Sequence, residues 1–525
     1  MTETAARRPK RPALLVAIGI LCSRVAGLVR QRVFAHYFGL GREADAFLAA
    51  FRIPNFLQNL FGEGALSASF IPVYASLVAR GEQRQADRVA GTVASLLALV
   101  VSVIVLAGVV ATPTLIRVIA PGFTGETRRL TIQIVRVLFP GAGLLVLSAW
   151  CLGVLNSHHR FLMSYSVPVA WNAAMIATLL AYGEQTPLPR LAVILAWGSV
   201  AGSAAMLLVQ LPSVLSVAPH LRLGLDPSDE VRTVVRNFVP AFISRGAVQV
   251  SAYVDTLLAS YLPTGAAAAL GNAQTLYLLP ISLFGMSVSA AELPAMSSAA
   301  TGDPSGHAAL RVRLNAGLRQ IAFFVVPSAM AFLALGDVVA AALLQTGRFG
   351  RPEVVYVWGI LAGSALGLLS STFARLYSSS YYALRDTGTP LRCAMVRIAL
   401  GIALGYVFAM PLPLWLGISP RWGVAGLTTA ASMSGWVELL LLRREMNARI
   451  GPTKLPAGYL VQLWAAAGAG AAGGWMVKLL MSPMHPAFIA LAVLGAYGLV
   501  FFALTWALRM PEATGAIGLL RRRSS

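Results

Sequence analysis

Residues 89–119 have the sequence VAGTVASLLALVVSVIVLAGVVATPTLIRVI, in which Arg117 is the single charged residue. An α-helix needs about 20 apolar residues to cross the roughly 30 Å of hydrocarbon in a bilayer, and this stretch is longer. Because the hydrocarbon holds no water, such a segment must satisfy its own backbone hydrogen bonds by forming a helix. Residues 89–119 therefore predict a membrane-spanning helix.

The rest of the chain repeats this pattern. Of its 525 residues, 57% are hydrophobic and 12% are charged, and the mean hydropathy is +0.72, whereas a soluble domain is roughly 45–50% apolar and about 25% charged. We predict an all-α polytopic membrane protein with about fourteen spanning helices and no loop long enough for a soluble domain. The predicted spans are 13–37, 44–76, 89–119, 130–155, 164–183, 190–218, 232–262, 265–297, 315–345, 353–384, 390–415, 421–445, 457–480 and 485–509.

The basic residues behind the net charge of +21 are unevenly distributed between the predicted loops of the two membrane faces. With the N-terminus inside, the loops on the inner face carry Arg80, Arg84, Arg88, Arg160, Arg222, Arg232, Arg236, Arg311, Arg313, Arg319, Arg385, Arg392, Arg397, Arg443, Arg444, Arg449, Lys454, Arg521, Arg522 and Arg523. Those on the outer face carry only Arg42, Arg128, Arg129, Arg190, Arg348, Arg351 and Arg421. This is the positive-inside bias of membrane proteins. It predicts an even number of spans in the cytoplasmic (inner) membrane with both termini cytoplasmic, and no nucleic-acid partner.

The first apolar segment follows a basic cluster at residues 7–11, as in a signal peptide. Arg24 and Arg30 interrupt it, and no convincing small-residue cleavage site follows, so we expect a first spanning helix instead.

Motifs for catalysis or metal binding are absent from the sequence. Cys22, Cys151 and Cys393 form no CxxC pair, and there is no HExxH, GxSxG or Walker A motif. His158 and His159 are adjacent beside a basic residue at a predicted helix end, which favours a place at the membrane interface over a metal site. We therefore expect neither an enzyme nor a cofactor.

Two halves of the chain resemble each other weakly. Residues 69–72 (SFIP) precede a basic loop, a long apolar helix and residues 120–123 (APGF), while residues 291–294 (AELP) precede the same arrangement and residues 345–349 (QTGRF). Chance is the alternative explanation. The pattern predicts a six-helix N-terminal lobe at 1–218, a six-helix C-terminal lobe at 219–450, and two appended helices with a basic cytoplasmic tail at 451–525, and transporters often bind substrate between such repeats.

Arg24 and Arg30 lie within the first apolar segment. An arginine at the centre of a spanning helix costs about 2.5–3.5 kcal/mol on insertion scales. Because helical residues turn by about 100° each, the two arginines are roughly 120° apart on a regular helix, and a hinge at Gly27 would bring both onto one cavity. With Ser23 beside them, two guanidiniums form a good receptor for a diphosphate. The alternative for Arg30 is a side chain that reaches the outer interface.

The second segment carries a polar run that is hard to place against lipid. Arg52 is followed by Asn55, Gln58 and Asn59, which we expect to face water or ligand. Asp45 and Glu63 bracket this run, and we expect Asp45 to pair structurally with an arginine.

Two later segments also contain charges. Segment 232–262 holds Arg245 and Asp255, which are about 80° apart around the helix and so are not expected to pair with each other. Asp255 is a candidate site for a coupling ion or proton, with an interhelical salt bridge as the alternative. Arg375 in segment 353–384 either lines the cavity or pairs with a neighbouring helix.

Several short motifs together resemble one known family. They are residues 23–30 (SRVAGLVR), 44–47 (ADAF), 52–57 (RIPNFL), 62–67 (GEGALS), 70–72 (FIP), 120–123 (APGF) and 382–387 (YALRDT). These residues look like those of the MurJ (MviN) family, within the multidrug/oligosaccharidyl-lipid/polysaccharide exporter superfamily. The resemblance spans the whole chain and is most specific at its N-terminal end.

The resemblance implies two six-helix lobes around a cationic central cavity, with helices 13 and 14 forming a groove for a polyprenyl tail. The implied cargo is lipid II, the undecaprenyl-diphosphate-linked peptidoglycan precursor, moved from the inner to the outer leaflet by alternating access. Arg24 and Arg30 match two cavity arginines of the family. Gln58 and Thr275 stand where relatives commonly carry arginine, which predicts a less positive cavity, and Arg52, Arg245 and Arg375 are the residues available to compensate.

Two other functions fit the same sequence features. One is an exporter of another polyprenyl-linked oligosaccharide or of a drug, which would share the fold and differ in cavity chemistry. The other is a non-transporting scaffold that recruits cell-wall synthesis proteins. Translocation of lipid II by the purified protein distinguishes a lipid II flippase from the other exporter and from the scaffold.

Overall fold

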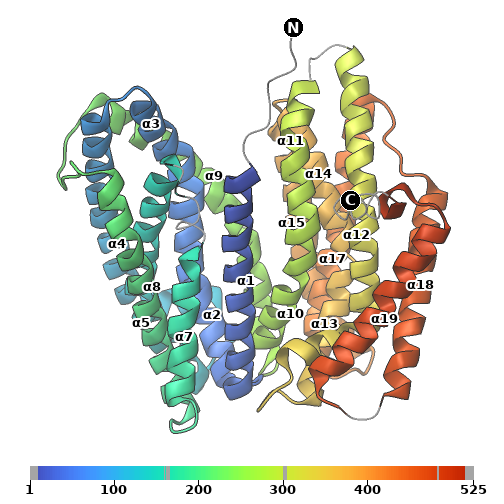
Figure 1. Ribbon diagram of the computed structural model, residues 1–525. Coiled ribbons are helices and arrows are strands. Elements are labelled where there is room, and N and C mark those ends of the chain that lie inside the picture. The colour runs from blue at the N-terminus through green and yellow to red at the C-terminus, as the bar shows by residue number, and fades with distance from the viewer. Residues whose placement is uncertain (1–9, 159, 161–165, 300–303, 482–483, 515–525) are drawn as a thin grey trace. The chain divides into compact units, whose positions relative to one another are not determined.

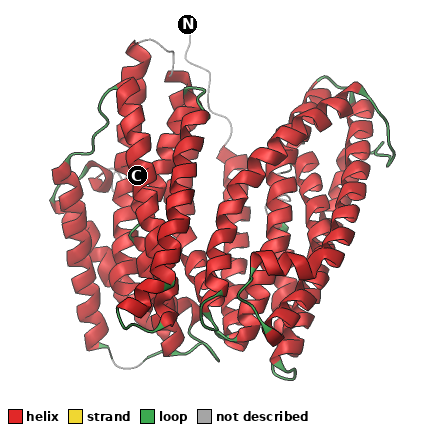
Figure 2. Cartoon of the chain, turned by 180° about the vertical axis from the view of Figure 1, so that it is seen from behind, coloured by secondary structure: helices red, strands yellow, loops and turns green. Residues whose placement is uncertain are grey.

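The computed structural model describes residues 10–158, 160, 166–299, 304–481 and 484–514. Within these ranges every regular element is an α-, π- or 3-10 helix (Figure 1, Figure 2). The described chain forms two compact units. Unit 1 comprises Met1–Ala268 with Thr346–Arg348, and unit 2 comprises Ala269–Gln345 with Phe349–Ser525. The predicted all-α class is therefore confirmed.

The positions of the helices follow the apolar segments. Each of the fourteen predicted segments coincides with one helix or with a run of adjoining helices. Within the described residues, nine helices are long and apolar enough to span a membrane, or ten if α13 and α14, which are bent by 42°, form one span. The number of fourteen spans stays a prediction.

Unit 1 is built around α5. Its elements are α1 (Lys10–Phe38), α2 (Arg42–Leu57), η1 (Gln58–Leu66), α3 (Ser67–Ala79), α4 (Gln83–Ile119), α5 (Gly125–Ser157), α7 (Pro168–Tyr182), α8 (Leu188–Val217) and α9 (Asp229–Ser260). Helix α5 packs against α2, α4 and α8, while α1 packs against α7, and α9 packs against α3 and η1. A cluster of buried aromatic rings joins α1 to α2, with the ring centroids of Phe34 and Phe47 5.4 Å apart.

Residues 346–348 belong to unit 1 because they dock on the C-terminal end of α1. The Arg348 amide donates to the His36 carbonyl at 2.9 Å, and His36 Nδ1 lies 2.8 Å from the Thr346 hydroxyl. Gly347 has a φ of +51°, and a Cβ there would lie 2.4 Å from the His36 oxygen. Glycine is therefore needed at this contact.

Unit 2 contains the remaining helices. Its elements are α10 (Ala266–Pro280, whose first residues belong to unit 1), η2 (Ile281–Met286), α11 (Ser287–Ala299), α12 (Pro304–Leu344), α13 (Arg351–Ala365), α14 (Leu368–Ala383), α15 (Gly388–Ala409), α16 (Pro411–Trp415), η3 (Pro420–Trp422), α17 (Gly423–Ile450), α18 (Ala457–Leu480) and α19 (Pro486–Ala507). Helix α17 packs against α13, α14 and α15. Helices α18 and α19 pair with each other and against α12, through a buried cluster that includes Leu335, Val493 and Tyr497.

The order of the elements repeats along the chain. A π-helix, η1, interrupts the second segment ahead of Pro72, and another, η2, interrupts the eighth segment ahead of Pro294. A π-helix has i→i+5 hydrogen bonds and is rare, so its recurrence at matching places supports two related halves. The three-part division at residues 218 and 450 stays a prediction. In the structure α9, which begins the predicted second lobe, lies in unit 1.

Asp386 caps the start of α15. Its carboxylate accepts hydrogen bonds from the Gly388 amide at 2.9 Å and the Thr389 hydroxyl at 2.7 Å, and Arg449 lies 2.7 Å from it. The Thr389 hydroxyl and amide, together with Arg449, hold the pKa of Asp386 well below its usual range. Asp386 therefore joins α15 to the last turn of α17.

We expect Asp386→Ala to lower the free energy of unfolding by about 1–2 kcal/mol, the usual cost of losing a helix cap. Because the pKa is lowered on folding, this stabilisation is present above the unfolded pKa of about 3.9 and is lost as the pH falls further. Thermal unfolding of the purified protein between pH 6 and pH 3 measures both effects. A wild-type pH dependence that is unchanged in Asp386→Asn would contradict this assignment.

Candidate functional site

The first helix is continuous past both of its arginines. Helix α1 runs as one α-helix from Lys10 to Phe38, so it is not unwound near Gly27, where a hinge is predicted. Gly27 is not crowded: a Cβ there would have Asn172 Oδ1 of α7 as its nearest neighbour, at 4.0 Å. A hinge at Gly27 in another conformation stays a prediction.

Arg30 is held by aromatic rings. Its guanidinium carbon lies 4.8 Å from the ring centroid of Trp171 and 5.8 Å from that of Phe51. Both distances are within the range of a cation–π interaction, which stabilises a desolvated cation by about 2 kcal/mol. The nearest polar partner is the weak acceptor Met175 Sδ at 3.9 Å. Arg30 is therefore stabilised inside unit 1 by aromatic rings, and among the described residues no carboxylate pairs with it.

Trp171 itself is fixed in place by α8. Its indole N–H donates to the Ser199 carbonyl at 3.2 Å, and a Cβ on Gly202 would lie 2.8 Å from its ring. The glycine thus lets α8 approach α7 closely enough to lock the ring that carries Arg30. Trp171 was not identified from the sequence, although a Trp-Asn pair in the first turn of a short apolar helix that begins at Pro168 is a weak signal for it.

Arg24 differs from Arg30 in its surroundings. The Arg24 side chain is exposed, Ser23 beside it is half-buried, and within the described residues Arg24 makes no ion pair. An arginine in an apolar helix without a carboxylate partner has its charge available for a ligand.

The polar run of the second segment lies at the junction of α2 and η1. Gln58 is the first residue of the π-helix and is half-buried, while Asn55 and Asn59 are exposed. Arg52 is half-buried, its carbonyl accepts a hydrogen bond from the Tyr253 hydroxyl at 3.3 Å, and its guanidinium interacts electrostatically with Asp255 of α9. Asp255 thus neighbours an arginine of a different helix, in agreement with the alternative of an interhelical salt bridge. A coupling-ion role for Asp255 stays a prediction.

Asp45 is buried and caps backbone amides. Its carboxylate accepts hydrogen bonds from the Gly265 amide at 2.6 Å and the Ala268 amide at 2.7 Å. In the part of the chain that the structure describes, no arginine pairs with it. The expected structural role of Asp45 thus involves backbone N–H groups in place of a guanidinium.

The remaining candidate residues are placed as follows. Thr275 lies in unit 2, where its hydroxyl donates to the Gly271 carbonyl at 2.9 Å. Arg375 of α14 is exposed and interacts electrostatically with Glu438 of α17, which also pairs with Arg397 at 3.0 Å. The side chains of Arg245 and Glu63 lie outside what the structure describes, as does His159. His158 Nε2 lies 2.9 Å from the Tyr74 hydroxyl.

Unit 1 therefore contains both arginines of α1 and the polar residues at the start of η1, and it surrounds Arg30 with aromatic rings of α2 and α7. These residues offer guanidinium and amide donors to an anion, and the described part of the chain holds no group of metal ligands. Donors of these kinds suit an anionic ligand.

Comparison with known sequences identifies one family. A family model described as "Lipid II flippase MurJ" matches residues 34–509. The lipid II flippase MurJ of Burkholderia cenocepacia is 30% identical to this chain over 446 residues, which cover 83% of this chain and 84% of that protein.

Comparison with solved structures agrees in fold. A structure titled "Lipid II flippase MurJ, inward closed conformation" matches with a TM-score of 0.77 at 23% identity, over 94% of this chain and 98% of that one. An inward-facing MATE family transporter of the MOP superfamily matches with a TM-score of 0.67 at 18% identity, over 84% and 99% of the two chains. At these identities the matches establish the fold alone, which is the all-helical fold of these two proteins.

Proposed function

This chain belongs to the lipid II flippase MurJ family, and we propose that it moves lipid II, the undecaprenyl-diphosphate-linked peptidoglycan precursor, from the inner to the outer leaflet of the cytoplasmic membrane. The proposed mechanism is alternating access, in which lipid II crosses the membrane without the action of a catalytic residue or a cofactor. The protein would thus supply the peptidoglycan-synthesis enzymes that act on the outer face.

The observation that carries this proposal is the state of Arg24 on α1. An arginine in a spanning helix costs about 2.5–3.5 kcal/mol on insertion scales, and no ion pair within the described residues offsets this for Arg24. A diphosphate would supply the missing negative charge, because each guanidinium grips phosphate oxygens through a planar fork. Arg30 would join it by leaving the Trp171 ring.

The other site residues take supporting roles in this proposal. Ser23, Arg52, Asn55, Gln58, Asn59 and Thr275 are the residues proposed to contact the sugar and phosphate oxygens. Gly27 would serve as the hinge of α1 during transport. Helices α18 and α19, the predicted thirteenth and fourteenth, would hold the polyprenyl tail, and cell-wall synthesis proteins are the proposed partners.

Complementation tests the proposal. The chain, expressed in a bacterium depleted of its own lipid II flippase, is expected to restore growth and cell shape, while a chain carrying both Arg24→Ala and Arg30→Ala is not. Failure of the wild-type chain at normal membrane abundance would favour an exporter of a different lipid-linked cargo. Rescue by the double variant would favour a scaffold.

We further predict that both termini are cytoplasmic, since the basic loops alternate along an even number of spans. Cysteine tags placed at residue 1 and at residue 525 should resist a membrane-impermeant label in intact cells and react after permeabilisation. A tag at residue 186, in the predicted outer loop before α8, is the positive control. Labelling of either terminus in intact cells would refute the topology.

A further inference from the structure

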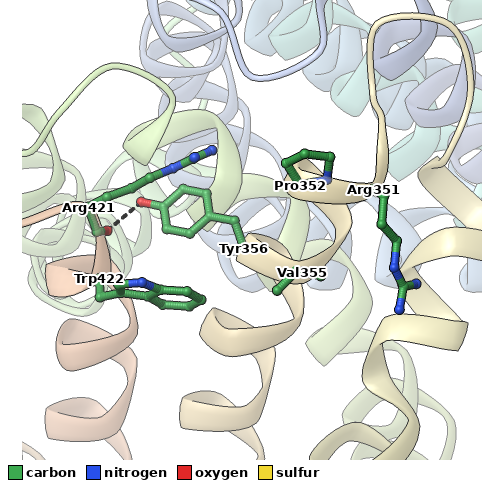
Figure 3. Close-up of a pocket in the computed structure, with 6 residues that line it drawn as sticks. All are labelled: Arg351, Pro352, Val355, Tyr356, Arg421 and Trp422. Atoms are coloured by element: carbon green, nitrogen blue, oxygen red, sulfur yellow. Dashed lines mark hydrogen bonds between the residues drawn. The ribbon is translucent and has the colours of Figure 1, made fainter. Parts of the chain in front are cut away.

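Unit 2 contains a pocket that none of the proposed site residues line. It has a volume of about 390 Å³ and lies between the first turn of α13 and the segment leading into α17 (Figure 3). Its lining residues are Arg351, Pro352, Val355, Tyr356, Arg421 and Trp422. A volume of roughly 300–1,000 Å³ is typical of small-molecule sites, so the pocket is large enough for a ligand.

Arg421 is a fixed cation on one side of this pocket. Its guanidinium carbon lies 4.2 Å from the ring centroid of Tyr356, and the Tyr356 hydroxyl donates to the Arg421 carbonyl at 2.7 Å (Figure 3). The Nε of Arg421 is buried without a hydrogen-bond partner, and within the described residues no carboxylate pairs with the guanidinium. A buried donor left unsatisfied in this way calls for an explanation.

Arg351 lies on the other side of the pocket, directed away from Arg421 (Figure 3). Its guanidinium pairs with Asp337 at 2.7 Å, and Asp337 also pairs with Lys478 at 2.8 Å. Glu353 accepts a hydrogen bond from the Gly350 amide in the first turn of α13. Asp337 therefore pairs with both Arg351 and Lys478, whereas Arg421 is the lining arginine that makes no ion pair within the described residues.

The pocket lies beside the N-terminal ends of two candidate spanning helices. Arg351 opens α13, the first part of a candidate broken span, and Pro420 opens the candidate span that continues through α17. The preceding segment exposes apolar side chains, with Trp415 75% and Leu416 62% exposed. Tryptophan and tyrosine beside a basic residue at helix ends are typical of the membrane interface, so lipid headgroups are within reach of Arg421.

We propose that this pocket binds the phosphate of an anionic membrane phospholipid, with the phosphodiester on Arg421 and the glycerol and first acyl carbons on Pro352, Val355 and Trp422. The one lining guanidinium without an ion pair among the described residues matches a singly charged phosphodiester better than a diphosphate, and the apolar walls suit the lipid backbone. This site is separate from the residues assigned to lipid II and does not depend on that function.

The test measures lipid binding to the purified full-length protein in a neutral detergent, by native mass spectrometry with titrated phosphatidylglycerol or phosphatidylcholine. The wild type is expected to bind phosphatidylglycerol at least about tenfold more tightly, and Arg421→Gln to lose that preference, since a charge-assisted hydrogen bond is removed. Arg421→Lys keeps the charge and the ring contact without the planar fork, and should bind at intermediate strength.

The matched control is Arg190→Gln, which removes an exposed arginine from the first turn of α8, and its lipid preference should equal that of the wild type. Melting temperatures without added lipid report whether each variant folds. Equal binding of the two lipids by the wild type would overturn the proposal. So would an unchanged preference in folded Arg421→Gln, or displacement of phosphatidylglycerol by millimolar inorganic phosphate, which would indicate a site for free anions.

Discussion

Arg24→Ala is expected to abolish complementation of a flippase-depleted strain while the protein still reaches the membrane at normal abundance. The substitution removes an exposed guanidinium that makes no ion pair within the described residues, so folding loses nothing and insertion of α1 becomes easier. Arg24→Lys should retain only part of the activity, because lysine is a point charge without the bidentate fork. Since Gln58 and Thr275 leave the site short of positive charge, we expect a harsher loss than in relatives with arginine there.

Arg117→Ala is the matched control for this experiment. It removes another exposed arginine of unit 1, in the last turn of α4, and should complement like the wild type. Quantification of each variant in the membrane fraction separates loss of transport from loss of protein. Normal growth with Arg24→Ala at wild-type abundance would remove Arg24 from the proposed mechanism, and attention would move to Arg52 and Arg245.

Asp337→Asn is expected to lower the free energy of unfolding by about 3–5 kcal/mol, the usual cost of breaking a buried ion pair by removing one partner. Asp337 is 1% exposed and pairs with Lys478 of α18 at 2.8 Å. The same contact region includes the Trp475 indole, which donates to the Ala334 carbonyl at 2.9 Å, and the Tyr497 hydroxyl, which donates to the Pro327 carbonyl. Without Asp337, Lys478 is left charged against α12, and the attachment of α18 and α19 weakens.

Two variants make this test specific. Asp337→Asn combined with Lys478→Met should recover part of the loss, because it removes the charge that the single variant leaves unpaired on Lys478, while Arg351 still lacks its partner. Asp229 is 92% exposed and forms a surface pair with Arg232, so Asp229→Asn should change stability by less than about 1 kcal/mol. Chemical denaturation of the purified proteins measures all three. Equal losses in the single and the double variant would show that Asp337 acts through something other than Lys478.

The helices were predictable because the membrane constrains them so strongly. A spanning segment must be apolar over about 20 residues and must satisfy its own backbone. The predicted segment 457–480 coincides with α18, and the predicted 13–37 lies within α1. The π-helix at Gln58–Leu66 was not predicted, because a shift to i→i+5 hydrogen bonds leaves no pattern of apolar residues.

The candidate site was predictable in part. Arg24 and Arg30 stand out because a charge in an apolar helix is costly. Their partners were not predictable, because Trp171 reaches Arg30 from a helix more than a hundred residues away. The expected break at Gly27 rested on both arginines sharing one cavity. Since the Trp171 ring stabilises Arg30 where a regular helix places it, α1 has no need to unwind here.

The most direct test of the central claim is translocation of lipid II by the purified protein. Vesicles would be prepared with fluorescent lipid II in both leaflets, and an enzyme or quencher added outside would report the fraction that becomes accessible over time. We predict that nearly all lipid II becomes accessible with the wild-type protein, and that only the initial outer-leaflet fraction does with Arg24→Ala or without protein. Vesicles containing folded wild-type protein in which the inner-leaflet lipid II stays protected, with a membrane potential or ion gradient imposed, would contradict the proposed function.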